Sequence, residues 1–398
     1  MDNHAPTTLN LGQAARVEAR ALLDWWARHA PELEGDGFYG EVGNDNQAVI
    51  TDKSVILNTR LLWFFSQAAL HIDYDLAAPL AKRAYEVLIK TFTDAQYGGL
   101  FWSLNAHNQP QETKKQAYAH AFGLYAVCAF YELTKDSTVL ETANGLASLI
   151  DTQFWDCDKG GYIEALSADW SHGADQRLSD KDADLPKTMN THLHVLEAYS
   201  EFYHICPTPE SKARLERILA LFLQRFISPD GRHVRLFYDM DWQDHSAAHS
   251  YGHDIESSWL IWEAALRLKD QALIDQARPV VLALAQSALG EGLNAKGAMS
   301  YEQPFGQARD DDGEWWGQAE ALVGFINAYQ MSHDKAYLNA AQRLWQHIEA
   351  EFKTKDKEWS WYAISASKSS PYIMGMWKCP YHNGRAMLEL MRRLNDKS

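Results

Sequence analysis

A short motif rich in glycine and aromatic residues recurs along the whole chain of 398 residues, and it limits the possible folds more than any other feature. Equivalent positions in its six copies are separated by 62, 62, 72, 65 and 62 residues. These positions are Phe38, Leu100, Tyr162, Val234, Met299 and Trp361. A repeat of this length holds two helices and their connections, so we expect six copies of one helix pair.

The segments between the motifs have apolar residues at the spacing of amphipathic helices. One set of predicted helices covers residues 54–69, 116–133, 190–204, 255–268, 315–329 and 383–394. A second set alternates with the first and covers residues 9–29, 77–91, 137–154, 210–226, 271–288 and 335–352. Six antiparallel pairs can close into a double ring, so the sequence predicts an all-α (α/α)6 barrel with short strands or turns at one end. An open helical solenoid is the alternative.

Composition supports one domain that spans residues 1–398. No linker rich in serine, proline or glycine interrupts the chain, and 46% of its residues are hydrophobic, which is enough to bury a large core. The first residues lack the features of a secretory signal, and apolar stretches such as 218–222 are too short to cross a bilayer. We therefore expect a cytoplasmic protein with no membrane partner.

Charge and cysteine content exclude further classes. Lys and Arg number 37 against 53 Asp and Glu, and no basic stripe is present, so we expect no nucleic-acid partner. The four cysteines have no CxxC spacing, which argues against a zinc site or a disulfide framework. The expected ligand is a small molecule, and the expected assembly is a monomer or a weak homodimer.

The helices of the first set begin with polar residues that a buried inner helix does not normally carry. Each polar group falls at the same phase of its repeat, so a closed ring would bring all six groups to one end. Clustering around a wet cavity would provide partners for these side chains, and we expect a pocket there. The groups are Asn58 and Arg60; Gln116, Tyr118 and His120; Asn190, His192 and His194; His253, Asp254 and Glu256; Glu314, Trp315, Trp316 and Glu320; and His382, Asn383 and Arg385.

Helical spacing sorts the members of these groups. His253 and Glu256 are three residues apart and share a helix face, so Glu256 is predicted to orient the imidazole of His253. His194 shares a face with Asn190, whereas His192 lies about 200° away from His194 on the helix. We therefore predict that His194 rather than His192 faces the pocket.

Aromatic and histidine side chains suggest what the pocket binds. Trp316 and Trp377 flank the polar groups, and flat aromatic faces stack against the C–H bonds of sugars. Each histidine on its own could instead be a hydrogen-bonded structural residue. A metal site is a further alternative, built from His192, His194, His253 and His382.

Six segments together carry a resemblance to a known family. They are Asn58-Thr-Arg60, Lys115-Gln-Ala-Tyr118, and the stretches 187–199, 250–259, 313–320 and 377–385. Over nearly the whole chain these motifs resemble the N-acylglucosamine 2-epimerase superfamily, and within it the cellobiose 2-epimerases.

The resemblance implies an (α/α)6 barrel and reversible inversion at C2 of the reducing-end sugar of β-1,4-linked disaccharides such as cellobiose and lactose, without a cofactor or a metal. It also implies site residues. His253 and His382 resemble the acid/base pair and Glu256 the partner of His253; Arg60, Tyr118, Asn190 and His194 resemble residues that hold the sugar; Trp316 and Trp377 resemble stacking platforms. Glu320 is expected to bind the substrate as well.

This chemistry needs a base on one face of C2 and an acid on the other, and imidazole suits both roles near neutral pH. Arg60 and His194 are candidates to stabilise the negative charge of the enediolate intermediate. A mannose 2-epimerase or mannose–fructose isomerase would use the same proton abstraction. A glycoside hydrolase with carboxylates drawn from Asp254, Glu314 and Glu320, and a non-catalytic sugar-binding barrel, are the alternatives from other classes.

Overall fold

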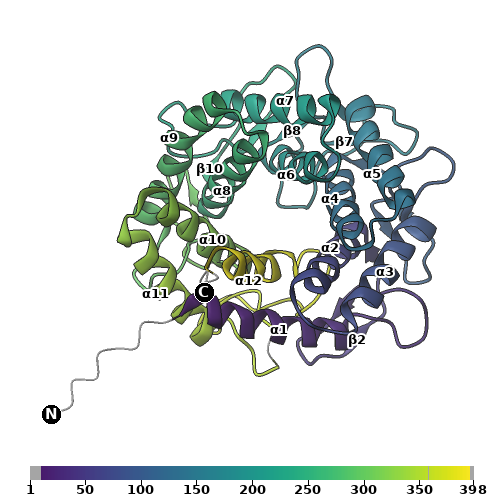
Figure 1. Cartoon of the computed structure of the whole chain (residues 1–398), viewed down its shortest axis with the longest axis horizontal. Helices are drawn as coiled ribbons and strands as arrows, with labels where there is room; N and C mark the ends of the chain where they lie inside the picture. Colours follow the sequence, from purple (N-terminus) through teal and green to yellow (C-terminus); the bar gives the residue numbers. More distant parts are fainter. Residues whose placement is uncertain (1–9, 357, 395–398) are drawn as a thin grey trace.

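Two concentric rings of helices make up the computed structural model, which describes residues 10–356 and 358–394. Figure 1 looks down the common axis of the rings. The inner ring consists of α2 (Val55–His71), α4 (Ala117–Thr134), α6 (Met189–Ile205), α8 (Tyr251–Leu268), α10 (Trp315–Ser332) and α12 (Tyr381–Leu394). The outer ring consists of α1 (Leu11–His29), α3 (Ala77–Val87), α5 (Ser137–Leu149), α7 (Pro209–Arg225), α9 (Gln271–Ser287) and α11 (Lys335–Glu351).

The last helix closes the barrel. α12 packs against both α2 and α10 in the inner ring and against α1 in the outer ring, so the two ends of the repeat lie side by side. The predicted (α/α)6 barrel is confirmed, and the open solenoid is wrong because it would leave α12 and α2 apart.

Burial patterns follow from the two rings. In α4, every residue from Ala117 to Phe130 is buried, because the helix has neighbours on all sides. In α11, the buried residues follow the three- and four-residue spacing of a helix with one solvent face. Three outer helices end in a wider turn, at Leu88–Phe92, Ile150–Phe154 and Ala288–Gly292.

No helix in the described residues is both long and apolar enough to span a membrane.

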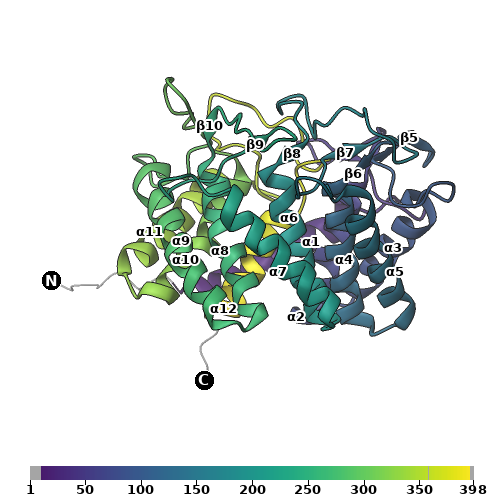
Figure 2. The same ribbon diagram turned by 90° about the horizontal axis from the view of Figure 1, so that it is seen from above.

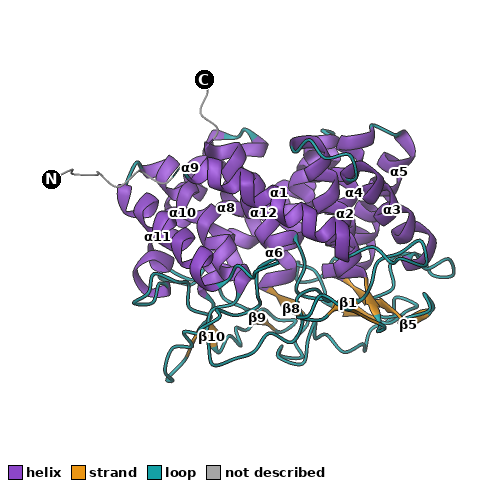
Figure 3. Cartoon of the chain, turned by 90° about the horizontal axis from the view of Figure 1, so that it is seen from below, coloured by secondary structure: helices purple, strands orange, loops and turns teal. Residues whose placement is uncertain are grey.

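Short antiparallel strands gather at the end of the barrel where the inner helices begin (Figures 2 and 3). β1 (Glu41–Val42) pairs with β2 (Ala48–Val49), and β3 (Lys53–Ser54), β4 (Ser103–Leu104) and β5 (Pro110–Glu112) form one sheet. Further pairs join β6 (Lys115–Gln116) to β7 (Ala165–Leu166), β8 (Lys187–Thr188) to β9 (Phe237–Tyr238), and β10 (Ala248–His249) to β11 (Gln303–Pro304). The strands predicted at one end of the barrel are therefore present.

The glycines of the repeated motif allow the backbone to approach the inner helices closely. Gly161 has a φ of +89°, and a Cβ atom there would lie 3.0 Å from Nε2 of His192. The backbone N–H of the next residue, Tyr162, donates to that same nitrogen at 2.8 Å. Gly99 repeats the arrangement, since a Cβ atom there would lie 2.6 Å from Nε2 of His120. A larger residue at either glycine would break the contact.

Four inner helices use their fourth residue to hold the motif, and we call these four side chains the anchor layer. His120, His192, Asp254 and Gln318 accept hydrogen bonds from the backbone N–H groups of Leu100, Tyr162, Val234 and Met299 at 3.0, 2.8, 2.7 and 2.8 Å. The anchor layer therefore ties the loops at the strand end to the inner ring.

Candidate active site

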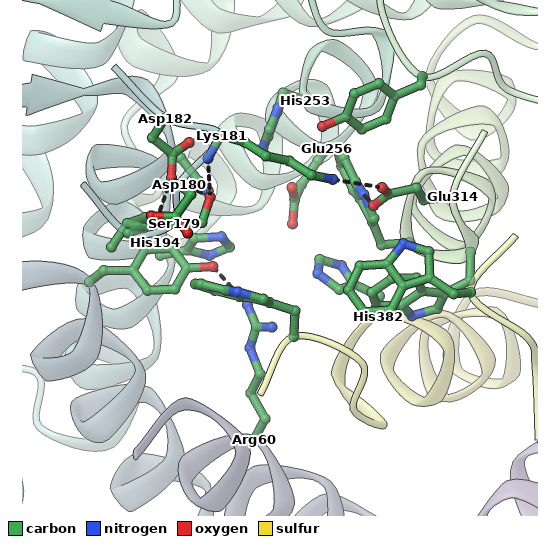
Figure 4. A pocket seen from close by; sticks show the side chains of 18 residues that line it. Arg60, Ser179, Asp180, Lys181, Asp182, His194, His253, Glu256, Glu314 and His382 are labelled. Atoms are coloured by element: carbon green, nitrogen blue, oxygen red, sulfur yellow. Dashed lines mark hydrogen bonds and ion pairs between the residues drawn. The ribbon is translucent and has the colours of Figure 1, made fainter. Parts of the chain in front are cut away.

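A cavity of about 380 Å³ opens at the strand end of the barrel (Figure 4). Nine of the ten predicted site residues line it: Arg60, Tyr118, Asn190, His194, His253, Glu256, Trp316, Trp377 and His382. Glu320 is the exception, and it contacts His382 instead. The repeat therefore brings together residues from all six inner helices or the segments before them.

Position within each inner helix decides which side chains reach this cavity. Tyr118, Asn190, Trp316 and His382 are the second residues of their helices, and Arg60, His194 and Glu256 are the sixth residues. These positions are four residues apart and share a helix face, whereas the fourth position of the anchor layer faces away. We call the cavity-lining second and sixth residues the cavity layer. His194 belongs to it and His192 belongs to the anchor layer.

His382 is held by a buried carboxylate. Its Nδ1 lies 2.7 Å from Oε1 of Glu320, whose other oxygen accepts a hydrogen bond from the indole of Trp259 at 3.0 Å. A carboxylate only accepts hydrogen bonds when ionised, so Nδ1 of His382 carries the proton and Nε2 is the nitrogen left for a ligand. Glu320 was expected to bind substrate, but it lies behind His382 because this imidazole stands between it and the cavity.

A second carboxylate holds His194 in the same way. Nδ1 of His194 lies 3.0 Å from Oε2 of Glu197, which also accepts a hydrogen bond from the hydroxyl of Tyr381 at 2.5 Å. Nε2 of His194 is thus the nitrogen left for a ligand. Glu197 shares a helix face with His194, but its role depends on partners from α12 that helical spacing does not reveal.

Arg385 joins the carboxylates that support these histidines. Its guanidinium is almost fully buried and pairs with Glu197, and its Nη2 lies 2.7 Å from both Glu256 and Glu320. One guanidinium cannot neutralise three carboxylates. Burial and the neighbouring charge of Glu320 raise the pKa of Glu256, which favours the protonated form of this carboxyl. Burial would raise the pKa of Glu197, but Arg385 and His194 hold it at about 2.

His253 has a different kind of partner. Its Nδ1 lies 2.8 Å from the hydroxyl oxygen of Ser250. The prediction that Glu256 orients His253 is therefore wrong. The carboxyl group of Glu256 turns to Arg385, because a buried guanidinium attracts it more strongly than a neutral imidazole does.

Burial favours the neutral form of all three cavity histidines. Burial lowers the pKa of His253 to about 3 and also lowers the pKa of His194. Burial, together with the charges of Arg60 and Arg385, lowers the pKa of His382 well below its ordinary value. Neutral imidazoles with Nε2 unprotonated are bases, as proton abstraction requires.

Arg60 supplies a buried positive charge to the cavity wall. Its Nη2 donates to the hydroxyl of Tyr118 at 2.8 Å, and its guanidinium lies 4.3 Å from the ring centre of Phe122. Its Nη1 contacts the sulfur of Cys379 at 3.5 Å. These contacts hold the guanidinium in place with no acidic partner among the described residues, so its charge remains available to an anion in the cavity.

Trp316 packs against both members of the expected acid/base pair. Its ring centre lies 4.8 Å from that of His253 and 5.7 Å from that of His382. Gly252 makes room for it, because a Cβ atom there would lie 2.5 Å from the indole. Both imidazoles therefore pack against the same indole. Trp377 lies across the cavity, beside Tyr118.

Sequence reasoning missed the loop that reaches over the cavity. Residues 178–182 line it, and the ammonium of Lys181 lies 3.7 Å from Glu314 at the start of α10 (Figure 4). This loop connects β7 to β8 through 20 residues, whereas 10 residues connect β4 to β6. The longer connection accounts for the 72-residue spacing in the repeat, which was the available signal. Tyr301, Trp315 and Trp361 also line the cavity.

Together the fold and the site define a class of (α/α)6-barrel proteins with histidines gathered around a cavity at the strand end. Residues 37–383 match the sequence model of the N-acylglucosamine 2-epimerase (GlcNAc 2-epimerase) family, and the chain belongs to this family. It is a carbohydrate epimerase, an enzyme of the isomerase class.

Known relatives match almost the full chain. A cellobiose 2-epimerase from Bacteroides fragilis is 39% identical over 376 residues, which is 93% of this chain and 95% of the relative. The solved structure of a cellobiose 2-epimerase from Bacillus thermoamylovorans has a TM-score of 0.90 and 31% identity, and the match covers 96% of this chain and 99% of that one. A D-mannose isomerase from Marinomonas mediterranea is 22% identical over 390 residues, covering 91% and 93%.

Proposed function

We propose that the protein inverts the configuration at C2 of the reducing-end sugar of a β-1,4-linked disaccharide such as cellobiose, with His253 and His382 as the acid/base pair. The observation that carries this proposal is the placement of both imidazoles against Trp316, each with Nδ1 engaged by a protein partner. A sugar stacked on Trp316 would meet Nε2 of each histidine. Identity of 39% to a cellobiose 2-epimerase supports the choice of substrate.

The reaction removes one proton from C2 of the sugar and returns one proton to the same carbon. Nε2 of one histidine removes the proton from C2 of the open-chain aldose, and the electron pair moves to the C1 oxygen to give an enediolate. The other histidine, in its imidazolium form, returns a proton to the opposite face of C2. The pair thus carries one proton in the reacting state, and the enediolate charge offsets the burial that otherwise disfavours imidazolium.

Groups of the cavity wall stabilise the enediolate. Arg60 provides a positive charge held by Tyr118 at the cavity wall, and it is our candidate to face the developing oxyanion. Glu256 lines the cavity, and in the protonated form that burial favours its carboxyl can donate a hydrogen bond to a substrate oxygen. His194 lines the cavity with its Nδ1 engaged by Glu197, and it is our candidate for the proton relay that opens the sugar ring.

Incubation with cellobiose, lactose and mannose, with products separated by chromatography, tests the substrate. We expect glucosyl-mannose from cellobiose and the matching epimer from lactose. The His382→Asn variant, purified in the same way, controls for contaminating activity. Conversion of mannose alone would contradict the proposal and favour a monosaccharide isomerase, the second candidate, to which the Marinomonas mediterranea relative points.

A glycoside hydrolase has less support from the site. Asp254 belongs to the anchor layer and pairs with His233 at 2.7 Å, and Glu320 lies behind His382. Of the three carboxylates considered for hydrolysis, Glu314 alone lines the cavity. Release of glucose from cellobiose would favour the glycoside hydrolase and contradict the proposed epimerase.

A further inference from the structure

Inner helices of the first and third repeats begin with a side-chain cap. The hydroxyl of Ser54 accepts a hydrogen bond from the backbone N–H of Leu57 at 3.0 Å, at the start of α2. Thr188 does the same for Thr191 at 3.1 Å, at the start of α6. Such caps satisfy a backbone donor that the first helical turn leaves unpaired.

Ser250 occupies the same position before α8 but makes no side-chain cap, although it and the first turn of α8 lie in the described part of the chain. Its hydroxyl instead lies 2.8 Å from Nδ1 of His253, the third residue of the helix. Ser250 is also almost fully buried. The residue type most suited to capping is thus present, but its hydroxyl contacts the imidazole.

We infer that Ser250 is a positioning residue for His253, and that its hydroxyl accepts the Nδ1–H bond so that Nε2 faces the sugar. This inference rests on the proposed role of His253 as one of the two acid/base residues. A lone imidazole can carry its neutral proton on either nitrogen and can rotate about its side-chain bonds. A hydrogen bond to Nδ1 fixes the ring orientation, and with the hydroxyl as acceptor it also fixes the tautomer that carries the proton on Nδ1.

The kind of partner distinguishes the histidines of the cavity. His194 and His382 donate to carboxylates, which stabilise an imidazolium by direct charge attraction. Ser250 is neutral, so it orients His253 without that stabilisation. The contact with Ser250 therefore acts on His253 through its orientation rather than through charge.

Three variants separate positioning from helix capping. Ser250→Ala removes the hydroxyl beside His253, Ser250→Thr keeps a hydroxyl there, and Ser54→Ala removes a true cap at the equivalent position of α2. We expect Ser250→Ala to lower kcat by about 10- to 100-fold with KM changed less than about threefold, because a lost imidazole partner affects orientation more than binding. Ser250→Thr should restore most of kcat.

Stability should show the opposite order. Ser54→Ala breaks a cap and should lower Tm by about 1–2 °C with kcat nearly unchanged, whereas Ser250→Ala breaks no cap and should leave Tm unchanged. A Tm loss for Ser250→Ala like that of Ser54→Ala, with wild-type kcat, would overturn the inference by showing that Ser250 is a structural cap.

A spectroscopic measurement tests the inference without reference to activity. Nitrogen-15 NMR of protein labelled on its 16 histidines, with the His253 signals assigned from His253→Asn, reports which ring nitrogen carries the proton. We expect Nδ1–H in the wild type and a mixture of tautomers in Ser250→Ala. An unchanged tautomer in Ser250→Ala would overturn the inference. Absence of activity on every sugar, with the tautomer shift present, would overturn the proposed function but not the role of Ser250.

Discussion

The anchor layer and the cavity layer are neighbouring sets of buried polar side chains on the same inner helices, and histidines occur in both. In the anchor layer, His192 has both nitrogens bonded to backbone, with Nδ1 on the carbonyl of Thr188 at 2.6 Å and Nε2 on the N–H of Tyr162 at 2.8 Å. In the cavity layer, one nitrogen of His194 and His382 is bonded to a carboxylate and the other faces the cavity. The partner of the second ring nitrogen, rather than burial or residue type, separates a structural histidine from one that is available to a ligand in the cavity.

The largest effect should come from removing either acid/base histidine. His382→Asn and His253→Asn should each lower kcat/KM on cellobiose by about 10³-fold or more, because each deletes one proton-transfer group. Circular dichroism and Tm should remain close to wild type, since neither side chain ties down a loop. If either variant kept near wild-type turnover, the substituted histidine would not be one of the proton-transfer groups.

Arg385 lies beneath the cavity layer and links the carboxylates of two histidines. Arg385→Lys keeps the charge but loses the planar fork, so it should lower kcat by about 10²-fold through misplaced imidazoles. It should also lower the free energy of unfolding by about 3 kcal/mol, because a single ammonium cannot replace the bonds of the guanidinium to the buried carboxyl groups of Glu256 and Glu320. Chemical denaturation measured beside steady-state kinetics would check both effects, and wild-type kinetics would show that the network has no part in positioning.

Two histidines separated by one residue give the sharpest contrast between the layers. His192→Leu should lower the free energy of unfolding by about 2 kcal/mol, because the N–H of Tyr162 loses its acceptor, and kcat should fall by less than about tenfold. His194→Leu should show the reverse pattern, with a large loss of kcat and a small loss of stability. Equal effects of His192→Leu and His194→Leu on kcat and on the free energy of unfolding would contradict the distinction between the anchor layer and the cavity layer.

Acid should weaken the anchor layer. Burial lowers the pKa of His120 to about 4 and that of His192 to about 3, whereas both residues titrate near 6.5 when unfolded. The unfolded chain therefore binds more protons below pH 6.5, and stability falls as the pH decreases from 6.5 toward the folded pKa values. Each residue should contribute about 2 kcal/mol of loss by pH 5. Chemical denaturation between pH 7 and 5 should show a shallower loss for His192→Leu than for wild type.

The smallest effect should come from the loop over the cavity. Lys181 is exposed and pairs with Glu314 across the cavity mouth at 3.7 Å, so the pair contributes at most about 1 kcal/mol. Lys181→Met should raise KM by about two- to fivefold and reduce the dependence of KM on salt. Lys159→Met is a matched control, because Lys159 is similarly exposed and pairs with Asp241 away from the cavity. Equal KM changes in both variants would show that the pair across the cavity has no special role.

Most of the fold could be predicted from the sequence because each copy of the repeat carries the same local features that form a helix pair. Apolar residues at helical spacing occur in each copy, and glycines with positive φ occur in the second to fifth copies, so the helix pairs and their closure follow from local patterns. The same periodicity places His194 on the cavity side and His192 on the anchor side, which helical phase alone predicts.

The parts that could not be predicted depend on contacts between repeats. Helical spacing places Glu256 beside His253, but the carboxyl group turns to Arg385, which lies 129 residues away in the chain. Glu320 was expected in the cavity, but His382 from the next inner helix covers it. The loop 178–182 crosses the mouth because of its length, and its contact with Glu314 follows from no local pattern.

Deuterium labelling in D₂O tests the central claim most directly, namely that proton transfer at C2 passes through imidazoles on both faces of the sugar. Cellobiose incubated with the enzyme in D₂O should give glucosyl-mannose with deuterium at C2, as read by proton NMR, and His382→Asn should incorporate none. Epimerised product that retains its original hydrogen at C2 would contradict the account, because it would require a transfer that never reaches a solvent-exchanging base.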